Sequence, residues 1–93
     1  MMDQREKDEG TIAALMLRMQ ESRLPRAEHL LEKVDQGGVL DDADIQFLKR
    51  VNEDYRSNQG LIKRNPDYFR IMSAFIDLYA EIVAKGLANE KAR

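Results

Sequence analysis

The segment 66–89 constrains the fold most, because its apolar residues cover more of a helix surface than one neighbouring helix can bury. At about 100° per residue, five of its polar residues fall within one arc of about 120°; they are Arg70, Ser73, Asp77, Glu81 and Lys85. The large apolar residues spread over about 200°; they are Phe69, Ile71, Met72, Phe75, Ile76, Leu78, Tyr79, Ile82, Val83 and Leu87. A surface helix needs a stripe of little more than about 100°. We therefore expect this helix to be central in the fold or to carry an oligomer interface.

Apolar residues elsewhere recur at spacings of three and four, the helical period. The chain is therefore predicted to be all-α, a small four-helix bundle with no β-strands. The expected helices cover about 3–22, 25–36, 42–59 and 66–89, and the third has residue 64 as an alternative end because Ile62 stays in phase with it. Short connections between helices favour antiparallel neighbours.

Glycine, proline and capping residues indicate the helix boundaries. Pro25 fits the first position of a helix, where its missing N–H needs no partner, so we expect the chain to be interrupted just before it. Gly37 and Gly38 favour a left-handed helix stop. Asp41 is a typical N-cap, and Asp44 stands three residues later, where a capping box places its acid. Asn65 is expected to cap the last helix ahead of Pro66.

Length and charge limit the classes of function. The chain has 93 residues, no cysteine, 15 Lys or Arg and 17 Asp or Glu, for a net charge of −2. We expect one helical domain, 1–93, whose charged start (1–9) is frayed or disordered. The absence of cysteine excludes disulfides and thiolate metal sites and favours the cytoplasm. No apolar run approaches the roughly 20 residues of a membrane span, and the balanced charges disfavour a nucleic-acid partner. In length and style the chain is similar to small bacterial helical proteins.

The single histidine, His29, is the first candidate for chemistry. Glu32 shares its helix face, and such a pair can serve in acid–base catalysis. Histidine phosphotransfer domains carry a motif resembling His-x-Leu-Lys-Gly, and here the sequence is His29-Leu30-Leu31-Glu32-Lys33. The glycine is missing, the lysine is one place late, and Glu32 would repel a phosphoryl group. An exposed surface histidine is the simpler interpretation, so we predict no catalytic residue, no cofactor and no metal.

Two other resemblances conflict with the sequence. The turn around Gly38 is similar to half of an EF-hand loop, but that alignment puts Lys33 where the first calcium ligand should be a carboxylate. All-helical chorismate mutases have about this length and use several cations; the candidates here are Arg18, Arg23, Arg26, Lys49, Arg50 and Arg56. Those enzymes begin with one long helix, whereas Pro25 and Gly37 are expected to divide the corresponding region of this chain.

Two basic corners form an alternative binding site. Arg23 and Arg26 flank the first expected turn, and Lys63 and Arg64 flank the last. Such corners can bind a small anion or nucleic acid. The competing interpretation is a solvated surface, because acidic residues stand beside them.

The favoured function is a non-catalytic protein–protein interaction module that self-associates through the wide apolar face of the segment 66–89. The expected interaction residues are Met72, Phe75, Ile76, Tyr79, Ile82 and Val83. The expected partner is a second copy, in a homodimer or other homo-oligomer, or another helical protein. Tyr68 is expected to lie on the polar, exposed side of the same helix.

Overall fold

The computed structural model describes residues 4–92, with side chains from Lys7 onward. The elements are α1 (Gln4–Arg18), the π-helical segment η1 (Met19–Arg23), α2 (Leu24–Asp35), α3 (Asp42–Ser57), α4 (Gln59–Arg64) and α5 (Pro66–Ala92). The all-α prediction is confirmed, since residues 4–92 contain no strand. Within residues 4–92, no helix is both long enough and apolar enough to cross a membrane.

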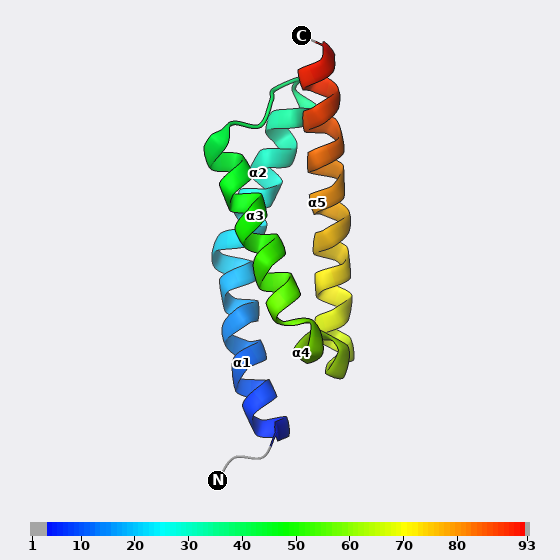
Figure 1. Cartoon of the computed structure of the whole chain (residues 1–93). Coiled ribbons are helices and arrows are strands. Elements are labelled where there is room, and N and C mark those ends of the chain that lie inside the picture. The colour runs from blue at the N-terminus through cyan, green and yellow to red at the C-terminus, as the bar shows by residue number, and fades with distance from the viewer. Residues whose placement is uncertain (1–3, 93) are drawn as a thin grey trace.

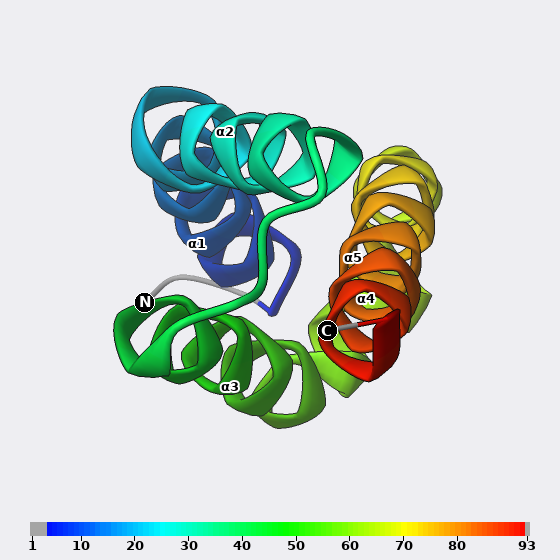
Figure 2. The same cartoon turned by 90° about the horizontal axis from the view of Figure 1, so that it is seen from above.

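The molecule is a narrow bundle measuring 57 × 20 × 19 Å. In Figure 1, α1 and α2 rise as one long rod, α3 descends beside it, and α5 rises again after the short α4 turn. Viewed from above, α2, α3 and α5 surround the bundle axis (Figure 2). The radius of gyration is 15.2 Å, against about 12 Å for a compact domain of this length. The elongated shape leaves each helix exposed along much of its length.

The first two helices have nearly the predicted bounds, but the expected interruption between them does not occur. Arg18, Arg23 and Leu24 all keep helical dihedral angles. Pro25 has no N–H to donate to the carbonyl four residues earlier. The turn before it is therefore widened, and the Leu24 N–H bonds to the Met19 carbonyl, five residues back. The π segment thus carries the helix past Pro25, and residues 4–35 form one continuous rod.

The turn between α2 and α3 forms as predicted. Gly37 has a φ of 90°, the left-handed conformation that glycine adopts at little cost. The Gly38 N–H donates to the Lys33 carbonyl at 3.0 Å. At the start of α3, the Asp44 N–H donates to Asp41 at 2.9 Å and the Asp41 N–H donates to Asp44 at 3.0 Å. The helix stop and the capping box are both confirmed.

The third helix ends at Ser57 and does not continue through Gly60. The Asn58 N–H bonds back to the Asp54 carbonyl at 3.1 Å, and its side-chain amide donates to the same carbonyl at 2.8 Å. The chain re-enters a helix only in α4. The Asn65 side-chain amide donates to the Leu61 carbonyl, so it closes the end of α4.

The core draws residues from every element after α1. Its buried members are Met19, Ala27, Leu30, Leu48, Val51, Ile62, Tyr68, Met72, Phe75 and Ile82. The prediction for Tyr68 is wrong, since it is only 5% exposed. It stands seven residues before Phe75 and fourteen before Ile82, and therefore shares their buried face. Burial raises the pKa of the Tyr68 hydroxyl.

The backbones of α2 and α5 approach closely near the C-terminus. Gly86 is buried, and a Cβ atom there would lie 2.9 Å from Leu40 Cγ. Glycine therefore lets the Leu40 side chain lie directly against α5. The Asn89 amide donates to the carbonyls of Val34 at 2.8 Å and Gly38 at 2.7 Å, which satisfies carbonyl groups at the end of α2.

Candidate interaction surface

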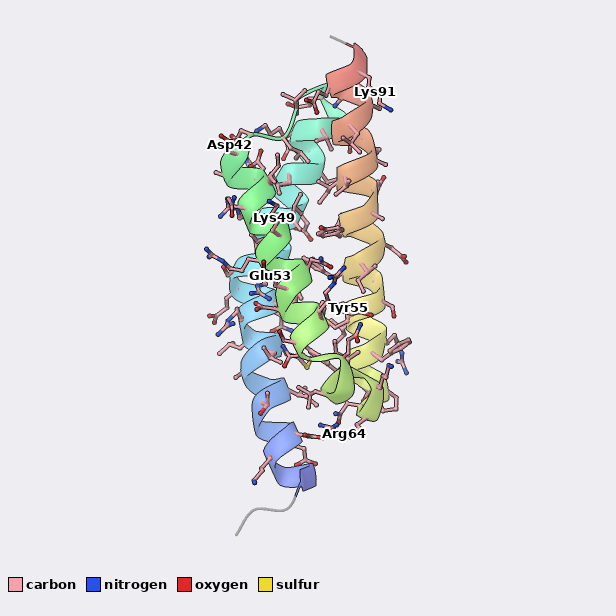
Figure 3. All side chains as sticks on the ribbon, in the orientation of Figure 1. Asp42, Lys49, Glu53, Tyr55, Arg64 and Lys91 are labelled. Atoms are coloured by element: carbon pink, nitrogen blue, oxygen red, sulfur yellow. The ribbon has the colours of Figure 1, made fainter. Side chains whose placement is uncertain are left out.

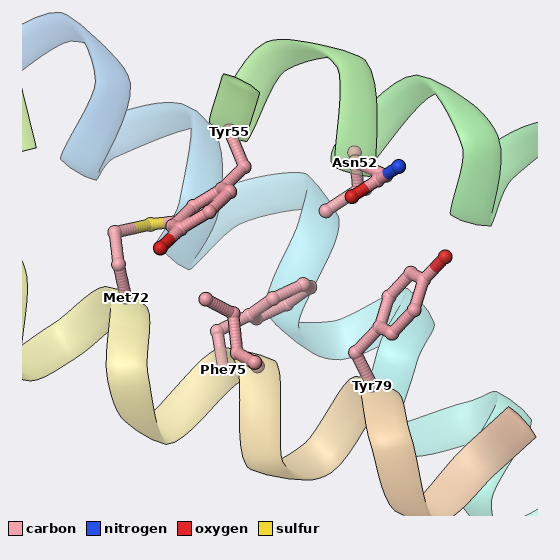
Figure 4. A pocket seen from close by; sticks show the side chains of 7 residues that line it. Asn52, Tyr55, Met72, Phe75 and Tyr79 are labelled. Carbon is pink, nitrogen blue, oxygen red and sulfur yellow. The ribbon is translucent and has the colours of Figure 1, made fainter. Parts of the chain in front are cut away.

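An apolar groove runs between α3 and α5, built from two cavities. The first, of about 130 Å³, is lined by Val51, Asn52, Tyr55, Met72, Phe75, Ile76 and Tyr79. Figure 4 shows Asn52 and Tyr55 extending from α3 toward Met72, Phe75 and Tyr79 of α5. The second, of about 190 Å³, is lined by Leu40, Ile45, Leu48, Lys49, Tyr79, Val83, Gly86, Leu87 and Glu90. Tyr79 lines both cavities, so they form one surface, called here the α3–α5 groove.

Large apolar side chains are exposed along this groove. Ile45 is 40% exposed, Ile76 36% and Leu87 52%, and each lines one of the two cavities. Phe69, 51% exposed, stands seven residues before Ile76 and falls on the same side of α5. Two antiparallel helices with an apolar groove between them can accept a further amphipathic helix.

The six residues of the expected interaction face divide into two groups. Met72, Phe75 and Ile82 are at most 5% exposed and belong to the core of the single chain, and Met72 and Phe75 also line the first cavity. Ile76, Tyr79 and Val83 line the groove and remain at least partly exposed. The wide apolar face of α5 is thus shared between the core and the groove.

The contribution of α3 to this surface was not predicted from the sequence. Ile45, Asn52 and Tyr55 supply the second wall of the groove. Ile45 and Tyr55 belong to the apolar stripe of their helix, and that stripe was the available signal. The stripe alone does not distinguish a side chain that is buried in the core from one that lies at the edge of the core and stays exposed.

Two further cavities lie along the N-terminal rod. One, of about 210 Å³, is lined by Met19, Leu24, Ile71, Ala74, Phe75 and Leu78. The other, of about 410 Å³, lies between α1 and the start of α5, and its lining includes Glu9, Asn65 and Asp67 beside apolar residues. The exposed large apolar residues that line a described cavity are all in the α3–α5 groove. The groove is therefore the best candidate for contact with another protein.

The first basic corner is engaged inside the molecule. Arg23 forms an ion pair with the Asp54 carboxylate of α3. Arg26 lies with its guanidinium carbon 4.6 Å from the centre of the Phe47 ring, a cation–π contact. These two arginines attach the rod to α3.

The second basic corner lies apart from the first, on α4. The Arg64 guanidinium donates to the two oxygens of Asp8 at 2.9 and 3.2 Å, and this hydrogen bonding raises the pKa of Arg64. Lys63 is exposed beside it. Three of the four corner cations therefore act in contacts between helices, and the structure does not bring the two corners together.

The remaining sequence candidates are His29 and the turn after α2. His29 is exposed on α2. Among the described side chains, no three His, Asp or Glu residues gather as metal ligands would. In the turn after α2, Lys33 Nζ lies 2.7 Å from Asp44 Oδ2. Hydrogen bonding to Asp44 raises the pKa of Lys33, and the Asp44 N–H lowers that of Asp41. These acids cap a helix and bind a lysine, which accounts for the pattern similar to an EF-hand.

The continuous rod removes one objection to a chorismate-mutase-like architecture, because the N-terminal region is a single long helix. The cations are not arranged for that chemistry, however. Arg23 and Arg26 are engaged with Asp54 and Phe47. Of the six candidate cations, Lys49 alone lines a described cavity. No cationic pocket results from them.

Comparisons with protein-family models, with curated proteins and with solved structures found no match to this chain.

Proposed function

We propose that this chain is a non-catalytic protein–protein interaction module that self-associates through the α3–α5 groove. The observation that carries the proposal is the apolar lining of the groove, with Ile45, Ile76 and Leu87 exposed along it. Contiguous apolar surface of this kind is typical of docking sites.

The total surface of the molecule supports the same proposal. The accessible surface is 6549 Å², whereas a compact monomer of 10.8 kDa exposes about 5,500 Å². The excess of about 1,000 Å² is similar to the roughly 800 Å² that each partner buries in a stable interface of standard size.

Solution size measured against concentration tests the proposal. We expect sedimentation equilibrium of the wild-type chain to give a dimer or larger oligomer at micromolar concentration. Ile76→Asp places a charge in the groove, so it should shift the chain to monomer while far-ultraviolet circular dichroism stays helical.

Leu17→Asp is the matched control. Leu17 is 54% exposed, but it lies on α1 outside the groove. This variant should associate like the wild type. A wild-type chain that stays monomeric at high micromolar concentration would overturn self-association, as would equal loss of association in both variants.

A further inference from the structure

We infer that the second copy packs on the groove in an antiparallel, twofold-symmetric arrangement, with α5 against the α5 of the other copy and α3 against its α3. This inference rests on the proposed function and adds the identity of the facing residues. It follows from how apolar and charged residues are distributed along the two helices that form the groove.

The exposed face of α5 is self-complementary about its midpoint. Phe69 stands nine residues before Leu78, and Leu87 nine residues after it; Ile76 and Ala80 stand two residues before and after. In a twofold interface, residue i of one copy meets residue j of the other, and j meets i. An antiparallel pair centred near Leu78 therefore brings Phe69 against Leu87 and Ile76 against Ala80.

The side-chain sizes and exposures suit this pairing. Phe69 and Leu87 are 51% and 52% exposed, so each gains cover from the other. Ile76 is 36% exposed and meets the small, exposed Ala80. Large residues facing small ones let the two helices interdigitate at an ordinary packing distance.

The midpoint of α5 lies level with the stretch of α3 between Lys49 and Asn52. Tyr79 marks this level, because it lines one cavity with Asn52 and the other with Lys49. A twofold axis at Leu78 therefore crosses α3 between these two residues.

The charges of α3 on the two sides of this axis are opposite in sign. Asp42, Lys49, Glu53 and Arg56 are exposed, and Figure 3 shows the first three in order along the helix. Antiparallel pairing about the axis places Lys49 opposite Glu53 of the second copy, and Asp42 toward the Arg56 end. Opposite charges then face each other across the interface.

The alternative arrangement, with α3 against the α5 of the second copy, fits the surface less well. It would cover Ile76 and Ala80 with the charged side of α3, so that Lys49 and Glu53 would lose water against apolar side chains. Uncompensated desolvation of charged groups is costly. The antiparallel arrangement sets apolar residues against apolar residues and charges against opposite charges.

A charge-reversal experiment tests the facing of the two α3 helices. Lys49→Glu gives four acids at the two-copy interface, and Glu53→Lys gives four cations, so each variant alone should bind itself on the order of tenfold more weakly than the wild type. An equimolar mixture of the two variants should recover wild-type association, because the unlike chains pair acid with cation. Each substitution also removes the opposite charges of Lys49 and Glu53, four residues apart within one helix. Mixing the two variants cannot restore that pair, so a recovery of association would report on contacts between the copies.

A cysteine experiment tests the register, since the natural chain has no cysteine. Phe69→Cys and Leu87→Cys chains, mixed and oxidised, should form disulfides between unlike chains. Neither chain alone should cross-link, because two copies of position 69 lie about 27 Å apart along an antiparallel pair.

The outcomes separate this inference from the proposed function. If the wild type associates but the charge-reversed mixture does not recover, or position 69 cross-links to itself, then the antiparallel arrangement is overturned and self-association stands. If Glu53→Lys alone associates more tightly than the wild type, the arrangement is likewise overturned. A strictly monomeric wild type overturns both.

Discussion

The two neighbours of α5 meet it in opposite ways. At the C-terminal end of α2, Gly86 and Asn89 hold α5 close, because Gly86 leaves room for Leu40 of the turn after α2 and the Asn89 amide bonds to the end of α2. On the α3 side, Tyr55 and Tyr79 stand between the helices, and cavities remain around them. Helix separation depends on the side chains at the contact. The same helix therefore completes a core on one face and offers a docking groove on the other.

The largest expected difference is between two isoleucines of α5. Ile82 is fully buried, and Ile82→Ala should lower the free energy of unfolding by about 3 kcal/mol through lost burial and a residual cavity. Ile76 is 36% exposed, and Ile76→Ala should cost less than about 1 kcal/mol. Urea unfolding at a concentration that keeps the chain monomeric measures both. Equal losses would contradict the division of α5 into a core face and a groove face.

The next largest effect concerns the close approach at Gly86. Gly86→Leu would push against Leu40 and should cost about 2 kcal/mol of stability through overpacking. Gly10 is the control, because a Cβ there would meet nothing within 4 Å. Gly10→Ala should instead stabilise the helix by up to about 1 kcal/mol. The thermal midpoints of the two variants should therefore move in opposite directions. A Gly86→Leu variant with an unchanged midpoint would show that the contact between α5 and Leu40 has room for a larger side chain.

A smaller loss of stability is expected when the Asn89 amide, which joins α5 to α2, is removed. Asn89→Ala removes two hydrogen bonds to backbone carbonyls, which should cost about 1–2 kcal/mol. Asn52→Ala, in the wall of the groove, should change stability by less than about 0.5 kcal/mol. Chemical denaturation of both variants gives the comparison. Similar losses would mean that the α3 side is as tightly connected as the α2 side.

The smallest effect is electrostatic and concerns the start of α3. The pKa of Asp41 is lowered in the folded chain, chiefly by the Asp44 N–H, with a contribution from Lys33. Because the pKa of Asp41 is lower in the folded chain than in the unfolded chain, its carboxylate stabilises the fold at pH values above the unfolded pKa of about 4. This stabilisation is lost as the pH falls through the folded pKa. Asp41→Asn keeps a capping oxygen without the charge. Its thermal midpoint should lie below that of the wild type at pH 7 and converge with it in acid. If the difference between the two thermal midpoints persists at low pH, the charge of the Asp41 carboxylate is excluded as its source.

Local signals in the sequence predicted the helices well. The Asp41–Asp44 capping box and the Gly37 stop require only neighbouring residues, and the structure has both. The apolar periodicity also predicted the all-α class. Such features depend on backbone chemistry that operates over a few residues, so a single sequence is sufficient for them.

Features that depend on spacing between helices were missed. Pro25 was expected to separate two helices, but a shift to i→i−5 bonding carries the rod past it. Gly86 is a glycine within an apolar helix pattern, which often marks a close contact, yet nothing nearby in sequence names Leu40 as its neighbour. Three residues of the candidate face, Met72, Phe75 and Ile82, are buried in the core for the same reason. The breadth of the apolar arc on α5 can be read from the sequence, but the part of that arc which α3 covers cannot.

The π segment has a consequence for insertions and deletions. A π turn holds one residue more than the α turn it replaces, so the side chains of α1 are rotated by about 100° relative to those of an unbroken α-helix. That rotation aims Asp8 at Arg64 of α4. Because Pro25 keeps the turn before it wide, removing one residue within Met19–Arg23 would shift α1 by one position and turn its Asp8 face away from Arg64. The number of residues in this segment therefore determines which side of the N-terminal helix meets the rest of the chain.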